Sequence, residues 1–493
     1  MSGSRTFVWP RAARAAGIGF VVTGLFLRIV RFLQDRSLWL DELQLSLNIV
    51  DRDFAELLTP LEHKQAAPPG FLLLERLSVV AFGDEEWALR LPPLLFGLLA
   101  LVLFARLCRE RLPPMAGLVA LALFALNAAL VEYSSEVKQY SVDVAATTLV
   151  LLLASRVADD APAGVRRAAW RPLAVAGAVV LWFSHAVAIV LVGVGAALLL
   201  AAARGALTWR SVLAVGALWG SGLWIHDTLF AGSIRADEYF RTYFGPDFAP
   251  HPFAGDGLRW YARKLELCLS TAGGGALRLL AAAALLGVAA LARRRERAVL
   301  LLGGLVGAFV LSSLELYPFR RRFLLFLVPG LLLVVAEGVA LLAARGRLGR
   351  AAGAAIAVGL LVLPALTSAR QVAAPPTKQE ARPLFREMAR RLLDGDHVHV
   401  HHRARMHFDF YAPRTGLAPT TVSFGRYHDP DSLPALRREL VAATAAPRNW
   451  IVVANLTDAE RDHLLRTIET LGALTDLLVE PGVAAVRCEV ARR

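Results

Sequence analysis

Residues 88–111 read ALRLPPLLFGLLALVLFARLCRER. Residues 88–104 of this stretch form an apolar run interrupted only by Arg90, which is typical of a helix that crosses a bilayer. Arg106, Arg109 and Arg111 follow the run at once. Arginines gather in the short cytoplasmic loops of membrane proteins, so this stretch predicts both a spanning helix and its direction.

Similar apolar runs recur from about residue 15 to residue 366 of a 493-residue chain that is 56% hydrophobic and 19% charged. We therefore expect a polytopic α-helical membrane protein with about eleven transmembrane helices. The formal charge of +13 is mostly arginine in short loops, so topology and lipid phosphate explain it better than nucleic acid. The three cysteines form no paired motif, which argues against a disulfide framework and a zinc site.

Further arginine clusters fall in every second loop, which predicts a multi-pass protein of the inner (plasma) membrane with a cytoplasmic N-terminus. These clusters are Arg5, Arg11 and Arg14; Arg166, Arg167 and Arg171; Arg204 and Arg210; Arg293, Arg294, Arg295 and Arg297; and Arg345, Arg347 and Arg350. The loops expected on the opposite, extracytoplasmic side are residues 34–87, 131–139, 231–276 and 315–322.

Two stretches do not fit ordinary spans. Residues 172–203 are too long for one helix and too short for two full ones, and the polar Ser184–His185 step predicts two short spans that meet there. Residues 68–82 predict an interfacial or re-entrant helix, because counting them as a span would invert every later arginine cluster. The membrane module is thus expected to cover residues 1–370, with large outer loops at 34–87 and 231–276.

The chain changes character from residue 375 to residue 493. Short strand-like runs at 449–454, 475–480 and 483–490 alternate with amphipathic helical stretches at 380–393 and 458–471. This pattern predicts a small soluble α/β domain on the extracytoplasmic side.

An acid pair opens the first outer loop. Asp41 and Glu42 follow Trp39 just beyond the first span, where tryptophan anchors the membrane interface. An adjacent acid pair is most often solvated, but partial desolvation at this boundary also suits a general base. The pair could hold a divalent cation, although no second acidic cluster completes a cage, so we assign no metal.

Polar residues mark the next two outer segments. His63 and Lys64 precede a helix that starts with proline. In the second outer loop, a helix through residues 132–143 would place Glu136, Tyr140 and Asp143 on one side, and Lys138 could turn toward the same cavity.

The sequence YPFRRR at 317–322 breaks the arginine pattern, because its position predicts the outer side. Guanidinium groups bind phosphate oxygens bidentately, so Arg320, Arg321 and Arg322 suit a lipid-linked phosphate. The alternative is that the flanking spans are misassigned and these arginines are cytoplasmic.

Histidines elsewhere favour structural roles. His397, His399 and His401 would share one face of a strand, but zinc would still need a fourth ligand, so with His402 we expect a solvated strand face. His185, between two short spans, is expected to be a hydrogen-bonded packing residue.

The order of these motifs resembles the GT-C glycosyltransferases that use polyprenyl-phosphate sugars, in particular the bacterial protein O-mannosyltransferase-like and aminoarabinose-transferase-like enzymes. The motifs that carry the resemblance are WLDE at 39–42, KQAAPP at 64–69, RLPP at 90–93, EVKQYS at 136–141 and YPFRRRF at 317–323. No single motif is specific, and their order and spacing over residues 15–345 carry the likeness.

The resemblance implies that Asp41 is the catalytic base, with Glu42 beside it. It also implies that Lys64, Lys138 and the Arg320–Arg322 group hold the donor phosphate. Some relatives have a basic residue adjacent to the prolines, whereas here Gln65 and two alanines follow Lys64. Four further side chains are candidates for the cavity: His63, Glu136, Tyr140 and Tyr317.

The implied partners are a polyprenyl-phosphate sugar donor and a glycan, lipid or protein acceptor. A lipid-linked oligosaccharide ligase or polymerase would also use outer arginines but would not need the acid pair. A transporter or flippase would use the polar loops as a vestibule, but the apolar runs lack the acidic or glycine-broken segments typical of transport sites.

Overall fold

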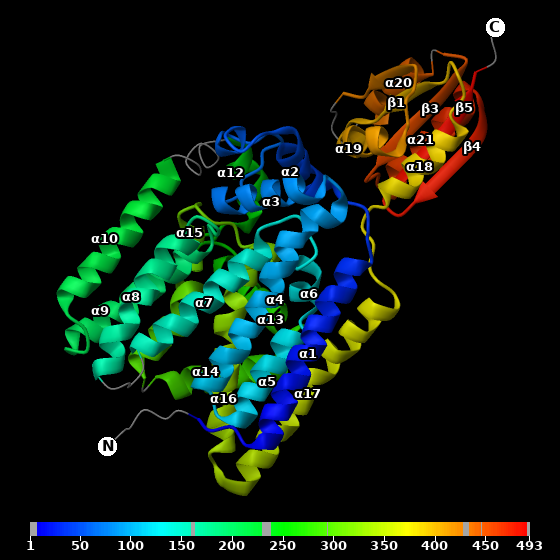
Figure 1. Ribbon diagram of the computed structural model, residues 1–493. Coiled ribbons are helices and arrows are strands. Elements are labelled where there is room, and N and C mark those ends of the chain that lie inside the picture. Colours follow the sequence, from blue (N-terminus) through cyan, green and yellow to red (C-terminus); the bar gives the residue numbers. More distant parts are fainter. Residues whose placement is uncertain are drawn as a thin grey trace. The chain divides into compact units, whose positions relative to one another are not determined.

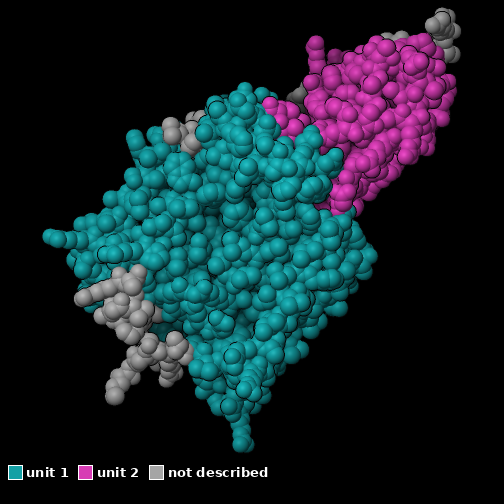
Figure 2. Space-filling model, viewed as in Figure 1, with its two compact units in different colours: residues 1–34, 52–375 teal, residues 35–51, 376–493 magenta. Residues whose placement is uncertain are grey.

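The computed structural model describes residues 7–158, 163–228, 238–292, 294–426, 433–444 and 446–490. Arg5, Arg293 and the start of the predicted 231–276 loop lie outside these ranges. The chain forms two compact units (Figure 2). Unit 1 comprises residues 1–34 and 52–375, and unit 2 comprises residues 35–51 and 376–493.

The regular elements described in unit 1 are all helices (Figure 1). Its α-helices are α1 (Arg11–Leu33), α3 (Pro69–Phe82), α4 (Glu86–Arg111), α5 (Pro114–Ala125), α6 (Ala128–Tyr133), α7 (Tyr140–Ala158), α8 (Ala163–Val180), α9 (Val187–Ala203), α10 (Trp209–His226), α12 (Glu238–Phe244), α13 (Gly257–Gly273), α14 (Leu277–Leu291), α15 (Arg295–Ser313), α16 (Val328–Ala343) and α17 (Gly346–Ala373). Short 3₁₀ helices are η1 (Glu56–Leu58), η3 (Gly245–Asp247) and η4 (Arg321–Leu327).

Six helical stretches in the described chain are long and apolar enough to cross a membrane: α1, α4, α7, α15, η4 with α16, and α17. The pair α13–α14, bent by 98°, makes a seventh if it is one span. The predicted polytopic helical membrane fold is confirmed. Three further helical stretches among the described residues are apolar but shorter: α5, α9 and residues Ala169–Val180 of α8.

The first of the two unusual stretches divides as predicted, and the second forms a short helix. The 172–203 region divides at residues 181–186, between α8 and α9, and residues 69–82 form the short helix α3. Proline at the first turn of α3 fits that position because the amide it lacks has no partner inside a helix. The predicted loop 231–276 is largely helical, since it contains α12 and α13.

Close contacts between helix backbones build the bundle. The Cα atoms of Gly193 on α9 and Gly303 on α15 face each other, and a Cβ added at Gly193 would lie 2.8 Å from the Gly303 Cα. Likewise, Cβ atoms at Gly287 on α14 and Gly338 on α16 would meet the Val334 and Ala283 carbonyl oxygens. Glycine at such crossings is typical of membrane helices, which gain van der Waals contact by approaching closely.

Unit 2 contains a five-stranded sheet in the order β2-β1-β3-β5-β4. The strands are β1 (His397–Val400), β2 (Thr421–Phe424), β3 (Arg448–Ala454), β4 (Ala473–Glu480) and β5 (Val483–Glu489). Strand β1 runs parallel to β2 and β3, whereas β5 runs antiparallel to β3 and β4. The three strands predicted from the apolar runs are therefore confirmed as β3, β4 and β5.

The helices of unit 2 are α18 (Ala381–Arg391), α19 (Arg405–Thr415), α20 (Leu433–Ala443) and α21 (Asp458–Leu471), together with α2 (Leu40–Asp51) from the first loop. Ile451 and Val453 of β3 pack with Leu464 and Ile468 of α21 in one buried cluster. Trp450 and Val452 of β3 alternate with them and are also buried, so the central strand is covered on both faces.

The glycine contact between α9 and α15 gives a matched test of the bundle. Gly193→Ala should destabilise the purified protein by about 1–3 kcal/mol, because the added methyl group forces two helix backbones apart. Gly195→Ala, two residues along the same helix where a Cβ would meet nothing within 4 Å, should change stability by about 0.5 kcal/mol or less. Thermal unfolding in detergent measures both, and equal effects would show that the crossing does not depend on glycine.

Candidate functional site

Motifs from separate loops meet in unit 1. The Lys138 ammonium donates to the Gln65 Oε1 at 2.7 Å, joining the second predicted outer loop to the KQAAPP motif. The Gly70 amide donates to the Trp182 carbonyl at 2.8 Å, which joins that motif to the break between α8 and α9. A Cβ at Gly70 would lie 2.8 Å from this same carbonyl, so the contact requires glycine.

The start of α7 joins the same group. Asp143 accepts a 2.6 Å hydrogen bond from the Ser184 hydroxyl, and that hydroxyl in turn accepts from the Val187 amide at the start of α9. The predicted helix through residues 132–143 is wrong in its first half, because α6 ends at Tyr133 and α7 begins at Tyr140. Glu136 lies buried in the intervening turn, which the Ser141 hydroxyl closes by donating to the Tyr133 carbonyl.

Aromatic side chains connect α7 to the triple-arginine segment. The Tyr140 ring lies edge-on to Tyr133 with centroids 5.1 Å apart, and 6.1 Å from the Phe323 ring. The Tyr317 hydroxyl donates to the Phe323 carbonyl at 2.6 Å. Burial, and then the Asp143 carboxylate, raise the pKa of Tyr317 well above its usual range, so this hydroxyl stays protonated and remains a donor.

Arg320 is held by the 231–276 region. Its Nε donates to Asp247 Oδ2 at 2.8 Å, and Lys264 of α13 donates to the other Asp247 oxygen at 2.9 Å. The guanidinium also lies over the Tyr243 and Phe244 rings, at 4.8 and 4.9 Å from their centroids. Burial acts to lower the pKa of Arg320, but Tyr243 and Asp247 outweigh it and raise the pKa above the ordinary value. Two cations therefore share one carboxylate, which leaves this group with a net positive charge.

The other predicted phosphate-binding cations differ in exposure. Arg321 is exposed, whereas Arg322 is half-buried with its guanidinium 5.5 Å from the Phe323 centroid. Lys138 is only 5% exposed. Lys64 is exposed, and both it and the half-buried His63 have positive φ angles of 55° and 58°. Consecutive left-handed residues other than glycine store strain, which is typical of functional turns.

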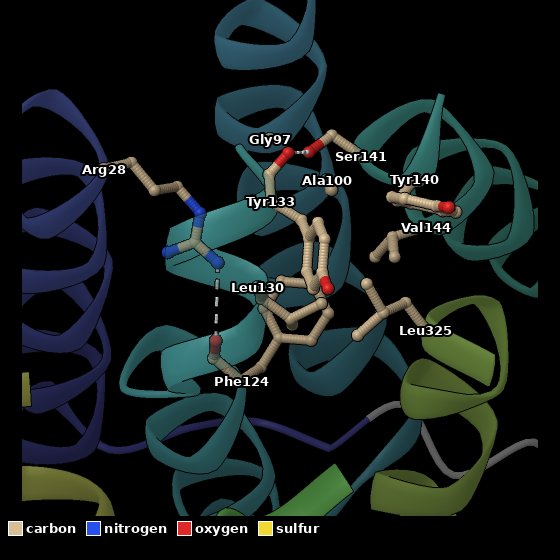
Figure 3. A pocket seen from close by; sticks show the side chains of 10 residues that line it. All are labelled: Arg28, Gly97, Ala100, Phe124, Leu130, Tyr133, Tyr140, Ser141, Val144 and Leu325. Carbon is tan, nitrogen blue, oxygen red and sulfur yellow. Dashed lines mark hydrogen bonds between the residues drawn. The ribbon is translucent and has the colours of Figure 1, made fainter. Parts of the chain in front are cut away.

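A small pocket beside Tyr140 contains a charge that no motif predicted (Figure 3). Arg28 of α1 is 1% exposed and donates to the Gly24, Ala125 and Phe124 carbonyls at 2.9, 3.3 and 3.5 Å. The last two carbonyls end α5, where free carbonyl groups favour a cation. We therefore assign Arg28 to helix capping rather than to the site.

The acid pair lies in unit 2, at the start of α2. Glu42 is fully buried, and its Oε2 accepts from the Trp39 amide at 3.4 Å, so this carboxylate helps to cap the helix. Asp41 is half-buried and offers the more accessible carboxylate of the two. The other predicted site residues belong to unit 1.

The expected solvated histidine face is wrong. His399 and His401 are 4% and 1% exposed. His399 contacts Ser423 of β2 at 2.9 Å and Glu439 of α20 at 3.0 Å. His185 packs edge-on against His226, with ring centroids 4.6 Å apart. Within the described ranges, no three His, Cys, Asp or Glu side chains come together as a metal site.

Several contributors were missed by the sequence analysis: Gln65, Ser184, Tyr243, Asp247 and Lys264. Each is an ordinary polar residue whose partner lies in a distant segment. One signal was present for Asp247, since a triple arginine near the membrane needs at least one carboxylate to offset its charge.

Comparison with known proteins gives one family match. Residues 66–219 match the family model described as dolichyl-phosphate-mannose-protein mannosyltransferase. Among curated proteins, none matches the chain in sequence.

Solved structures share the fold over nearly the whole chain. ArnT from Cupriavidus metallidurans in the apo state is 13% identical with a TM-score of 0.57, covering 97% of this chain and 98% of that one. The same protein bound to undecaprenyl phosphate is 12% identical with a TM-score of 0.54, covering 95% and 97%. The archaeal oligosaccharyltransferase AglB from Archaeoglobus fulgidus, in complex with an inhibitory peptide and a dolichol-phosphate, is 12% identical with a TM-score of 0.52, covering 97% and 74%.

These matches extend over the membrane helices and the C-terminal sheet domain alike. The chain therefore has the GT-C fold, and its predicted resemblance to the glycosyltransferases that use polyprenyl-phosphate sugars is confirmed.

Proposed function

We propose that this protein is a membrane glycosyltransferase that moves a sugar from a polyprenyl-phosphate donor to a hydroxyl group of a glycan, lipid or protein, on the extracytoplasmic face. The observation that carries the proposal is the convergence of Lys138, Tyr140, Tyr317 and the Arg320–Arg322 segment in unit 1. The buried Lys138 and the half-buried Arg320 and Arg322, together with the Tyr317 hydroxyl, suit a phosphate that leaves with negative charge.

The donor class is supported by the structures that share the fold. One contains undecaprenyl phosphate and another a dolichol-phosphate. In the proposed reaction, Lys138 and the arginines hold the donor phosphate. His63, Lys64 and Glu136 belong to segments that contribute further polar groups to the cavity.

Asp41 is proposed as the general base. Its carboxylate removes the proton from the acceptor hydroxyl while the acceptor oxygen attacks the anomeric carbon. The bond from that carbon to the phosphate oxygen breaks, the polyprenyl phosphate departs, and the configuration inverts. Glu42 is assigned a supporting role, since it is buried and accepts from the Trp39 amide just before its own helix.

Asp41→Asn tests the base. Asparagine keeps the size of the side chain but cannot take a proton, so single-turnover transfer at saturating donor should fall by about two to four orders of magnitude. Donor affinity should stay unchanged, and Glu42→Gln should lower the rate less. A rate for Asp41→Asn near that of the wild type, in folded protein, would refute this mechanism and favour a transporter.

Lys138→Gln tests the phosphate site. It removes a charge that is almost fully buried, so binding of a polyprenyl-phosphate sugar should weaken about 30-fold, or about 2 kcal/mol. The double variant Arg321→Gln with Arg322→Gln should weaken binding as well. The matched control is Arg210→Gln, an exposed arginine at the start of α10. Unchanged affinity in both test variants would mean that these cations serve packing or topology.

The proposed orientation places the N-terminus in the cytoplasm and the C-terminal domain outside the inner membrane. A reporter active only in the periplasm should therefore be active when it is fused after Arg493. A reporter active only in the cytoplasm should be silent at the same position. The opposite result would reverse the orientation and move the proposed site to the cytoplasmic face.

A further inference from the structure

Three consecutive residues at the start of the C-terminal part of unit 2 contact the segment before Asp41. Glu380 Oε2 accepts from the Ser37 amide at 3.2 Å and from its hydroxyl at 3.0 Å. Gln379 Oε1 accepts from the Leu40 amide at 2.6 Å. The Lys378 ammonium lies 4.0 Å from the centroid of the Trp39 ring. We call residues 378–380 the clamp.

The clamp acts on the amides that open α2. The first amides of a helix have no partner within it, so whatever accepts their hydrogen bonds fixes how the helix begins. Leu40 is the first residue of α2, and its amide is bound by Gln379. The Leu38 amide is bound by the Tyr411 hydroxyl of α19 at 2.6 Å. Asp41 follows directly, so the direction of its side chain depends on these acceptors.

A second hydrogen bond, from His407, holds the Gln379 side chain in place. Gln379 is 3% exposed, and its Oε1 also accepts from His407 Nε2 at 2.9 Å. Burial lowers the pKa of His407 to about 4, so the imidazole is neutral at ordinary pH and holds a single proton. Because the amide oxygen of Gln379 only accepts, that proton lies on Nε2.

The rest of the clamp is tied to the turn between β4 and β5. The Glu380 amide donates to the Pro481 carbonyl at 2.9 Å. Gly482 has a φ of 72°, and a Cβ there would lie 2.5 Å from the Lys378 carbonyl oxygen. The turn between β4 and β5 thus contacts the backbone of the clamp at both Lys378 and Glu380.

We propose that Gln379 is a positioning residue for Asp41, so that the C-terminal domain takes part in transfer by aiming the base. This inference rests on the proposed function, in which Asp41 removes the acceptor proton. No catalytic residue was predicted in the C-terminal domain, so under this proposal the domain affects turnover only by positioning Asp41.

The test compares two variants at one position. Gln379→Leu keeps the volume but removes the acceptor for Leu40, so kcat should fall about tenfold or more while the KM for the donor stays the same. Gln379→Glu keeps the accepting oxygen and should restore kcat to within about threefold of the wild type. Arg391→Gln, which breaks exposed ion pairs to Glu387 and Asp476 on the same domain, should leave kcat unchanged.

Two further measurements separate aiming from general damage. In an Asp41→Asn background, Gln379→Leu should cause no additional loss, because residues that act through one group are not additive. If Gln379→Leu fails to fold, Tyr411→Phe removes the acceptor for Leu38 and should lower kcat in the same way. Additive losses in the double variant would overturn the proposal. So would a folded Gln379→Leu or Tyr411→Phe variant whose kcat equals that of Arg391→Gln.

The outcome is distinguishable from failure of the proposed function. If Asp41→Asn turns over normally, the assignment of the base is wrong whatever Gln379 does. If Asp41→Asn is inactive and Gln379→Leu behaves as Arg391→Gln does, the base stands and only the clamp proposal fails.

Discussion

Glycine lets helix backbones touch in unit 1, and the arrangement of the candidate site depends on that closeness. Lipid tails are as apolar as leucine, so membrane helices gain little from burying apolar surface against each other. Gly193 and Gly303 bring α9 against α15, and Gly287 and Gly338 bring α14 against α16. Helix α9 follows the Ser184 break, α15 leads into Tyr317, and η4 leads into α16. The two crossings therefore fix elements that bear or adjoin site residues.

Side chains from distant segments satisfy the open ends of helices in both units. Arg28 donates to carbonyls at the end of α5, where the helix dipole favours a cation. At the N-terminus of a helix, where amides lack partners, Gln379 accepts from the first amide of α2. Such bonds do more than stabilise a helix. Each one makes the direction in which a helix begins or ends depend on a residue that is distant in sequence.

Local patterns predicted the elements well. Apolar length predicted the membrane helices, the Ser184–His185 step predicted the break between α8 and α9, and the short apolar runs predicted β3, β4 and β5. Contacts between residues that are distant in sequence could not be predicted from local patterns. Nothing near Asp41 indicates that residues 35–51 pack with residues beyond 375. The triple arginine indicates that a carboxylate lies nearby, but it does not indicate that this carboxylate is Asp247. The alternation in β1 does not tell whether the His399 side chain is solvated, and its contact with Glu439 of α20 is what the sequence pattern cannot show.

Unit 2 is discontinuous, and this has a consequence for biosynthesis. Its first piece, residues 35–51, leaves the ribosome before almost all of the membrane helices, and the residues that bind it come only after residue 375. At about 5–20 residues per second, tens of seconds separate the two pieces. During that interval the Leu38 amide and the first amide of α2 lack their acceptors, Tyr411 and Gln379. Helix α2 therefore reaches its final form only once translation is nearly complete, so a truncated chain would insert its helices yet leave the acid pair unassembled.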